Sequence, residues 1–162
     1  MREQKPFKTW HLVFLLMIVS LSIGYKIYGS LWTKATIKIG DREVRVLVAD
    51  TQAHRFKGWS DRKDMGKYGG MLFVFPDSGQ HAMVMRDMHF PLDIVWLDGN
   101  KIVDIAPNLP PEPGIAEDKL TVYRARAAST LVLELPTGFK DQTGLKIGDE
   151  VEIFTKNNYN KS

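Results

Sequence analysis

Hydrophobic residues are distributed along this chain in two different patterns. The first is one long run, Thr9–Tyr25, which holds 17 residues without a formal charge and lies between Lys8 and Lys26. As a helix this run would span about 25 Å, close to the roughly 30 Å of a bilayer's hydrocarbon core. The pattern therefore predicts an N-terminal transmembrane helix within residues 1–33.

Basic residues next to the long run indicate how it would be oriented. Arg2, Lys5 and Lys8 precede it, and the positive-inside rule then leaves the N-terminus in the cytoplasm and the rest of the chain outside. The predicted location is the cytoplasmic membrane, crossed once. The alternative is a signal peptide cleaved near Ser22 and Gly24, which would leave a secreted or periplasmic protein.

The second pattern is a series of short apolar runs separated by turn residues, which predicts strands. Thr36–Ile39 and Glu43–Ala49 alternate apolar and polar residues on either side of Gly40-Asp41 and predict a hairpin. A short helix capped by Asp50 is expected to run to Lys57 and end at Gly58. Further strands are predicted at Gly70–Phe75, His81–Met85, Asp93–Leu97, Lys101–Ala106, Thr130–Leu135 and Glu150–Phe154, with an extended proline loop at Pro107–Gly114 and a second short helix between Pro136 and Gly144.

These elements predict a mainly β (α+β) fold. Many short strands with tight turns and one or two short helices are typical of a compact barrel or sandwich. The soluble domain is expected to cover residues 34–155, followed by a polar, flexible tail at 156–162.

Charge and cysteine content narrow the classes of function. The chain has 22 basic and 19 acidic residues, and four of the basic residues but only one acidic residue lie in the first 33 positions. The remaining domain is neutral, so it lacks the basic surface expected of a nucleic-acid-binding protein. The absence of cysteine excludes disulfides, thiol chemistry and a lipid-modified cysteine.

Several short motifs follow one another along the soluble part of the chain: Arg55–Gly58, Gly70–Phe75, Met85–Met88, Pro91–Ile94, Leu133–Leu135 with Gly138, and Gly144–Asp149. In this order they resemble the motifs of the domain of unknown function 192 family, over about Thr36 to Ile153. Two positions depart from the family pattern: Trp59-Ser60 stands in place of Leu-Met, and Asp87-Met88 in place of Asn-Thr. The resemblance implies a small β-rich domain, often exported or membrane-tethered, with no recognised cofactor.

Asp93 and Glu134 are the candidate functional carboxylates, because each sits in or beside an apolar strand. A carboxyl group in an apolar pocket has a raised pKa and can act as an acid or base. One hypothesis is therefore a hydrolase that uses the two carboxylates as a pair. In the alternative, they pair with Arg55 or Arg62, or accept backbone N–H bonds, and stabilise the core.

A second hypothesis is a binding or accessory module of the cell envelope with a shallow cleft. Trp59 follows a helix-ending glycine and is expected to be exposed, where it could stack on a ligand. The expected ligand is an envelope glycan, peptide or protein. The cleft would be built from Arg55, Trp59, Arg62, Met85, Asp93, Glu134 and the Pro110–Pro113 loop.

Two further alternatives are a metal site and a structural role. His81, Asp87, His89 and Asp93 could hold a metal, but the neighbouring methionines match ordinary core residues, and neither a metal nor a cofactor is expected. A purely structural interaction domain is the third hypothesis. It predicts that changes at Asp93 and Glu134 alter stability or assembly alone.

Overall fold

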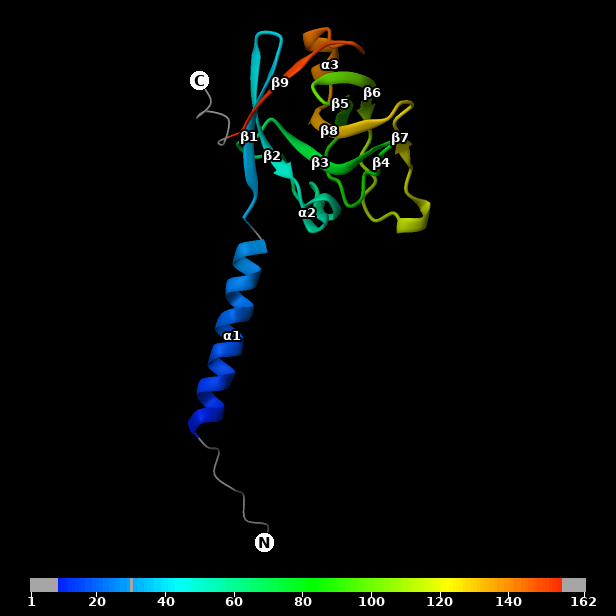
Figure 1. The fold of residues 1–162 in the computed structure, drawn as a ribbon. Helices are drawn as coiled ribbons and strands as arrows, with labels where there is room; N and C mark the ends of the chain where they lie inside the picture. Colours follow the sequence, from blue (N-terminus) through cyan, green and yellow to red (C-terminus); the bar gives the residue numbers. More distant parts are fainter. Residues whose placement is uncertain (1–8, 30, 156–162) are drawn as a thin grey trace, which may run out of the picture. The chain divides into compact units, whose positions relative to one another are not determined.

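The computed structural model describes residues 9–29 and 31–155. The chain divides into two compact units, Met1–Trp32 and Thr33–Ser162. The first unit contains the helix α1 (Thr9–Gly29), and Figure 1 labels it together with the elements of the second unit. The basic residues Arg2, Lys5 and Lys8 and the predicted tail at 156–162 lie outside the described residues.

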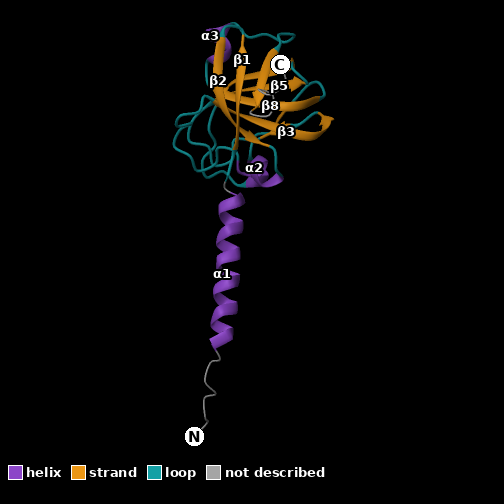
Figure 2. Cartoon of the chain, turned by 60° about the vertical axis from the view of Figure 1, so that its left-hand side comes forward, coloured by secondary structure: helices purple, strands orange, loops and turns teal. Residues whose placement is uncertain are grey.

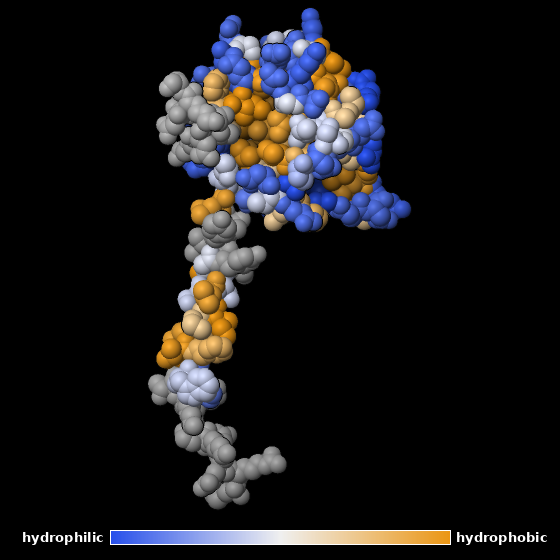
Figure 3. Space-filling model, in the orientation of Figure 1, coloured by the Kyte–Doolittle hydropathy of each residue, from blue (hydrophilic) through white to orange (hydrophobic). Residues whose placement is uncertain are grey.

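Helix α1 carries exposed apolar side chains on all its sides. Leu12, Phe14, Leu16 and Leu21 are each more than half exposed, and Figure 3 shows apolar surface along this segment. Within the residues described, however, no helix is both long and apolar enough to cross a membrane. The predicted transmembrane helix is therefore not supported by the structure.

The first strands of the second unit form the predicted hairpin. Strands β1 (Thr33–Ile39) and β2 (Arg42–Ala49) pair antiparallel on either side of Gly40, whose φ of 57° suits a tight turn. Helix α2 (Gln52–Lys57) follows, and Thr51 rather than the predicted Asp50 caps it, since the Thr51 hydroxyl accepts from the His54 amide at 3.1 Å.

The remaining elements largely follow the prediction. The predicted strand at His81–Met85 shrinks to two residues, and the predicted proline loop begins inside a strand that runs to Leu109. The elements are β3 (Gly70–Gly79), β4 (Ala82–Met83), β5 (Leu92–Asp98), β6 (Lys101–Leu109), the 3-10 helix η1 (Glu117–Lys119), β7 (Tyr123–Arg124), β8 (Ser129–Pro136), α3 (Phe139–Thr143) and β9 (Val151–Thr155).

Seven strands form one curled sheet in the order β6-β5-β8-β3-β2-β1-β9, antiparallel except for the β2–β3 pair. Its two edge strands meet at one end. The Ile102 amide donates to the Asp149 carbonyl at 2.9 Å, and the Val151 amide donates to the Asn100 carbonyl at 2.8 Å. The sheet is therefore a half-closed barrel, as Figures 1 and 2 show, and the predicted mainly β class is confirmed.

The strand register divides the side chains between the two faces of the sheet. On β8, Leu133 lies opposite Leu72 of β3 and Val95 of β5, and all three belong to the main hydrophobic core. Glu134 lies opposite Met71 and Ile94, one residue further along each pair. Because successive side chains of a strand point to opposite faces, Glu134 lies on the face away from that core.

Candidate functional site

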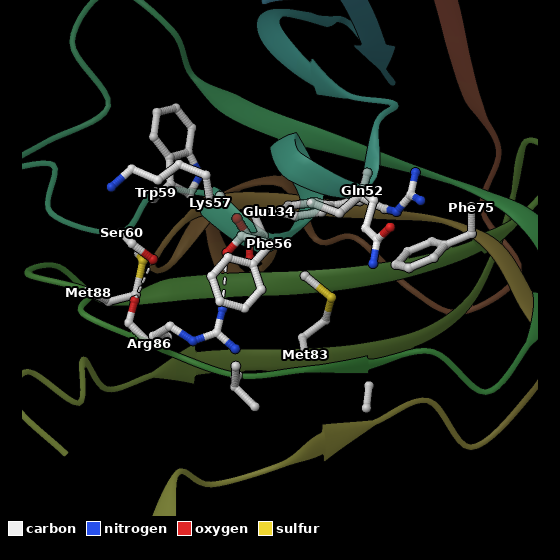
Figure 4. A pocket seen from close by; sticks show the side chains of 15 residues that line it. Gln52, Phe56, Lys57, Trp59, Ser60, Phe75, Met83, Arg86, Met88 and Glu134 are labelled. Carbon is white, nitrogen blue, oxygen red and sulfur yellow. Dashed lines mark hydrogen bonds between the residues drawn. The ribbon is translucent and has the colours of Figure 1, made fainter. Parts of the chain in front are cut away.

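A pocket of about 280 Å³ lies on the face of the sheet that carries Glu134. Figure 4 shows side chains of α2, of β3 and of the segment after β4 surrounding it, with Glu134 among them. Most of its lining is apolar, with charged groups from α2 and Arg86. The residues that line it are Gln52, Arg55, Phe56, Lys57, Gly58, Trp59, Ser60, Phe73, Phe75, Ala82, Met83, Val84, Arg86, Met88 and Glu134.

Two backbone turns hold the walls of the pocket together. The Ser60 hydroxyl donates to the Arg86 carbonyl at 2.9 Å, and the Asp61 amide donates to the Asp87 carbonyl at 3.0 Å. Asp61 and Asp87 both have positive φ, at 62° and 49°. Short polar side chains tolerate that conformation, so these turns can bring the end of α2 against the segment after β4.

Glu134 is a buried carboxyl group with an unpaired oxygen. The residue is 4% exposed, and its Oε2 atom has no hydrogen-bond partner. Burial alone raises the pKa of the Glu134 carboxyl to about 8, since desolvation disfavours the charged form. At pH 7 the group is therefore mainly neutral and can both donate and accept a hydrogen bond.

Trp59 also lines the pocket and carries a second unpaired polar atom. Its side chain was expected on the surface but is 1% exposed, so that prediction is wrong. The centre of its ring lies 6.1 Å from the centre of the Phe90 ring and 5.2 Å from the Arg62 guanidinium. The tryptophan is buried because removing its large apolar surface from water lowers the free energy of the folded state. Its Nε1 atom is buried without a hydrogen-bond partner.

Asp93 has a different role from Glu134. It is fully buried, and its carboxylate accepts from the amides of Asn108 at 2.8 Å, Gly138 at 3.2 Å and Lys140 at 2.8 Å. Asp93 thereby connects β5 to the end of β6 and to the start of α3. The expected alternative of backbone N–H bonds is correct for this residue.

The register also separates the two carboxylates. Asp93 lies opposite Leu135, and Glu134 lies opposite Ile94, so the two side chains point to opposite faces of the sheet. The hypothesis of an Asp93/Glu134 acid–base pair is wrong, because a substrate on one face cannot contact both groups.

Three cationic side chains line the pocket, and each has partners. Arg55 donates to the carbonyls of Asp50 and Val74, both at 2.9 Å, and Lys57 contacts Asp61 at 2.6 Å. Neither Arg55 nor Lys57 pairs with Glu134, contrary to the expectation that arginines would neutralise the site. The contact with Lys57 lowers the pKa of the Asp61 carboxyl, chiefly through the hydrogen bond between them.

Arg86 connects three parts of the pocket face. It forms an ion pair with Glu117 of η1, donates to the Phe56 carbonyl at 3.0 Å, and lies 4.1 Å from the centre of the Phe56 ring. Hydrogen bonding to Arg86 lowers the pKa of the Glu117 carboxyl and raises the pKa of the guanidinium. Both groups therefore stay charged over the physiological range.

The structure brings only part of the predicted cleft together. Arg55, Trp59 and Glu134 share the pocket, and Arg62 contacts it through the Trp59 ring. Met85 is fully buried and does not line it, so it is a core residue. Asp93 is on the other face, and the Pro110–Pro113 loop does not line the pocket, although its Glu112 forms a backbone bridge with Arg86.

Several lining residues were missed in the sequence. Phe73 and Phe75 alternate along β3 and share the face of Glu134, a signal that becomes useful only once the β3–β8 register is known. Phe56, Met83, Arg86 and Met88 come from α2 and the segment around β4, whose approach to the sheet depends on tertiary contacts. Within the described part of the chain, no three histidine or acidic side chains gather as metal ligands.

A curled sheet with a small pocket on its outer face defines a compact β-rich domain. Comparison with family models places it more narrowly. Residues 35–153 match the DUF192 family, whose description reads "Uncharacterized ACR", and the chain belongs to this family. The family resemblance noted in the sequence is confirmed.

Two solved structures share the fold. One is a putative transcription regulator from Sinorhizobium meliloti 1021, with 25% sequence identity, a TM-score of 0.64, and 75% of this chain and 93% of that chain covered. The other is a protein of unknown function from Novosphingobium aromaticivorans, with 27% identity, a TM-score of 0.62, and 75% and 84% covered. No curated protein matches the chain significantly.

Proposed function

We propose that this protein is a binding or accessory module of the cell envelope, attached to the cytoplasmic membrane through its N-terminal helix, with the β domain outside. The proposed ligand is a small molecule or a group of an envelope glycan, peptide or protein, bound in the pocket around Glu134. The observation that carries this proposal is that two residues lining one pocket, Glu134 and Trp59, each carry a buried polar atom without a hydrogen-bond partner, Oε2 and Nε1.

Unpaired buried polar atoms favour binding because each one costs free energy until it gains a hydrogen-bond partner. Leaving such a group without a partner costs about 1–3 kcal/mol, and a ligand that satisfies it recovers part of that cost. An apolar pocket with a few convergent polar groups is the usual form of a small-molecule site. Its volume suits a compact ligand or a single protruding group of a larger one.

The proposed membrane attachment rests on the apolar side chains that α1 exposes, although no described helix is long and apolar enough to cross a membrane. Exposed apolar surface favours an apolar environment, and α1 belongs to a unit separate from the β domain. A secreted or periplasmic protein after cleavage of this segment is the alternative. Protease added to spheroplasts should digest the β domain, whereas protection of the domain until lysis would contradict an outside location.

The binding function is tested with the full-length protein in nanodiscs. A thermal-shift screen covers envelope saccharides and peptides, together with two variants that introduce a tryptophan at exposed alanines. Ala82→Trp would fill the pocket, because Ala82 lines it, whereas Ala128→Trp is the matched control outside the lining.

The expected result is a ligand that raises the melting temperature of the wild type and of Ala128→Trp by about 2 °C or more, and of Ala82→Trp much less. A shift of equal size in all three proteins would place binding outside the pocket. No shift from any class of ligand would argue against a binding function.

A further inference from the structure

The unpaired polar atoms of two residues that line the pocket indicate the chemistry of its ligand, an inference that rests on the proposed binding function. We infer that the pocket recognises an uncharged carboxamide group on a compact apolar body, through the Glu134 carboxyl and the Trp59 indole N–H. Both side chains are more than nine-tenths buried, and both line the same pocket.

The hydrogen-bonding capacity of the two groups matches an amide. The indole N–H of Trp59 only donates, so it needs an acceptor oxygen. A protonated Glu134 carboxyl donates from one oxygen and accepts at the other, and burial keeps it protonated at pH 7. A carboxamide presents a carbonyl oxygen and N–H groups next to each other. Its oxygen can therefore accept from the Trp59 indole or the Glu134 carboxyl, and its N–H groups can donate to the Glu134 carboxyl.

Charged ligands fit the pocket less well. A cation would find no ionised carboxylate at Glu134 at pH 7, and it would meet Arg55 and Lys57 from α2 and Arg86 from the segment after β4. The neighbours of Glu134 in the register, Met71 on β3 and Ile94 on β5, carry no charge.

An anion is disfavoured for a different reason. Each of the three cations is already engaged, Arg55 with carbonyl oxygens, Lys57 with Asp61 and Arg86 with Glu117. An anionic ligand would therefore lose its hydration in an apolar pocket without gaining a new ion pair.

The apolar lining indicates the size and polarity of the ligand beyond its carboxamide group. Phe73, Phe75, Met83 and Met88 present aromatic and thioether surfaces around the polar pair. The pocket volume of about 280 Å³ lies just below the range of roughly 300–1,000 Å³ typical of drug-sized ligands. A single ring or a short branched chain beside the amide is the expected size.

Three probes with the same ring separate these possibilities: benzamide, benzoate and benzylammonium. Each is titrated into full-length protein in nanodiscs with ¹⁵N-labelled tryptophan, and the Trp59 indole signal, assigned with Trp59→Phe, reports binding in the pocket. Trp96 is an internal control, because its Nε1 already donates to the His81 carbonyl at 2.9 Å.

Benzamide is expected to shift the Trp59 signal with an affinity at least about tenfold above those of the two charged probes, while the Trp96 signal stays in place. Glu134→Leu should remove most of that preference. Affinity for benzamide should fall about fivefold as the pH rises through 8 and the carboxyl loses its proton, and Glu134→Gln should bind benzamide with no such pH dependence.

The failures of the two proposals are distinct. Tighter binding of benzylammonium or benzoate at Trp59 would overturn the carboxamide inference and leave the pocket as a binding site. No shift of Trp59 with any probe would also overturn the inference. The binding function itself fails only if the envelope screen with Ala82→Trp and Ala128→Trp is negative as well.

Discussion

The β5–β8 strand pair carries one buried carboxyl group on each face, and the two groups differ in their hydrogen bonds. Asp93, on the side of the main core, accepts three backbone N–H bonds, and Glu134, on the pocket side, has an oxygen with no partner. Both residues are buried to within a few per cent. The difference therefore lies in hydrogen bonding and not in exposure.

This contrast separates a structural from a functional use of the same chemistry. Three backbone amides replace the hydrogen bonds that the Asp93 carboxylate made with water in the unfolded chain, so they offset the free-energy cost of burying it. The same bonds fix the positions of the segments that Asp93 connects. At Glu134 that compensation is absent, and the protein carries a cost that a ligand can relieve. The predictions below test whether the two carboxyl groups really differ in this way.

The largest loss of stability is expected from Asp93→Asn. The amide replaces one acceptor oxygen by an N–H₂ group that faces backbone donors, so at least one amide among Asn108, Gly138 and Lys140 loses its partner. The free energy of unfolding should fall by about 3 kcal/mol, measured by urea denaturation. Asp98→Asn, at the exposed end of β5, is the control and should change little. Equal effects would mean that the three bonds contribute no net stability.

Glu134→Gln should have the opposite sign. The pKa of Glu134 is about 8 in the folded protein, against an ordinary value of 4.5. Between these two pH values the unfolded chain releases the proton while the folded protein retains it, so wild-type stability falls as pH rises and levels off above 8. The variant lacks this loss.

The stability advantage of Glu134→Gln should be absent near pH 4 and reach about 4 kcal/mol at pH 8, measured as unfolding free energy against pH. Glu43→Gln, at an exposed position of β2, is the matched control and should leave the pH profile of the wild type intact. A constant difference between Glu134→Gln and wild type across pH 4–9 would show that the folded protein does not retain the proton.

The contrast explains what could be predicted from the sequence. Local patterns gave the β1–β2 and β5–β6 hairpins and singled out Asp93 and Glu134, because apolar runs and turn residues are local signals. Their assignment as a pair failed, since the faces they occupy follow from the β5–β8 register, a long-range property. The burial of Trp59 and the contribution of Arg86 to the pocket also depend on long-range contacts, so local sequence patterns did not predict them.

A smaller effect is expected at the turn that shapes the pocket wall. Gly58 ends α2 with φ of 47°, and a Cβ there would lie 3.5 Å from the Phe73 ring, an ordinary contact. Its ψ of −131° lies outside the left-handed helical region, so Gly58→Ala should cost about 2 kcal/mol through backbone strain alone. Gly40→Ala, at φ of 57° with open space around it, is the control for a positive φ without a neighbouring side chain. A loss well above about 3 kcal/mol at Gly58 would mean that the pocket wall cannot adjust around Phe73.

The smallest effect on global stability is expected from Arg86→Lys. This variant tests how firmly η1 is attached to α2 beside the pocket. Lysine keeps the charge opposite Glu117 but cannot bond the carboxylate and the Phe56 carbonyl together as the guanidinium does. The free energy of unfolding should hardly change, because exposed ion pairs contribute little. The rate of amide hydrogen exchange at Lys119, whose N–H donates to the Ala116 carbonyl, should nevertheless rise, because η1 loses its bidentate attachment.

The control is Arg124→Lys, which alters an exposed contact with the Gln80 carbonyl and should leave the exchange at Lys119 unchanged. Unchanged exchange in both variants would mean that the pocket face is as firmly held as the Asp93 side, and that the two faces differ in polarity alone.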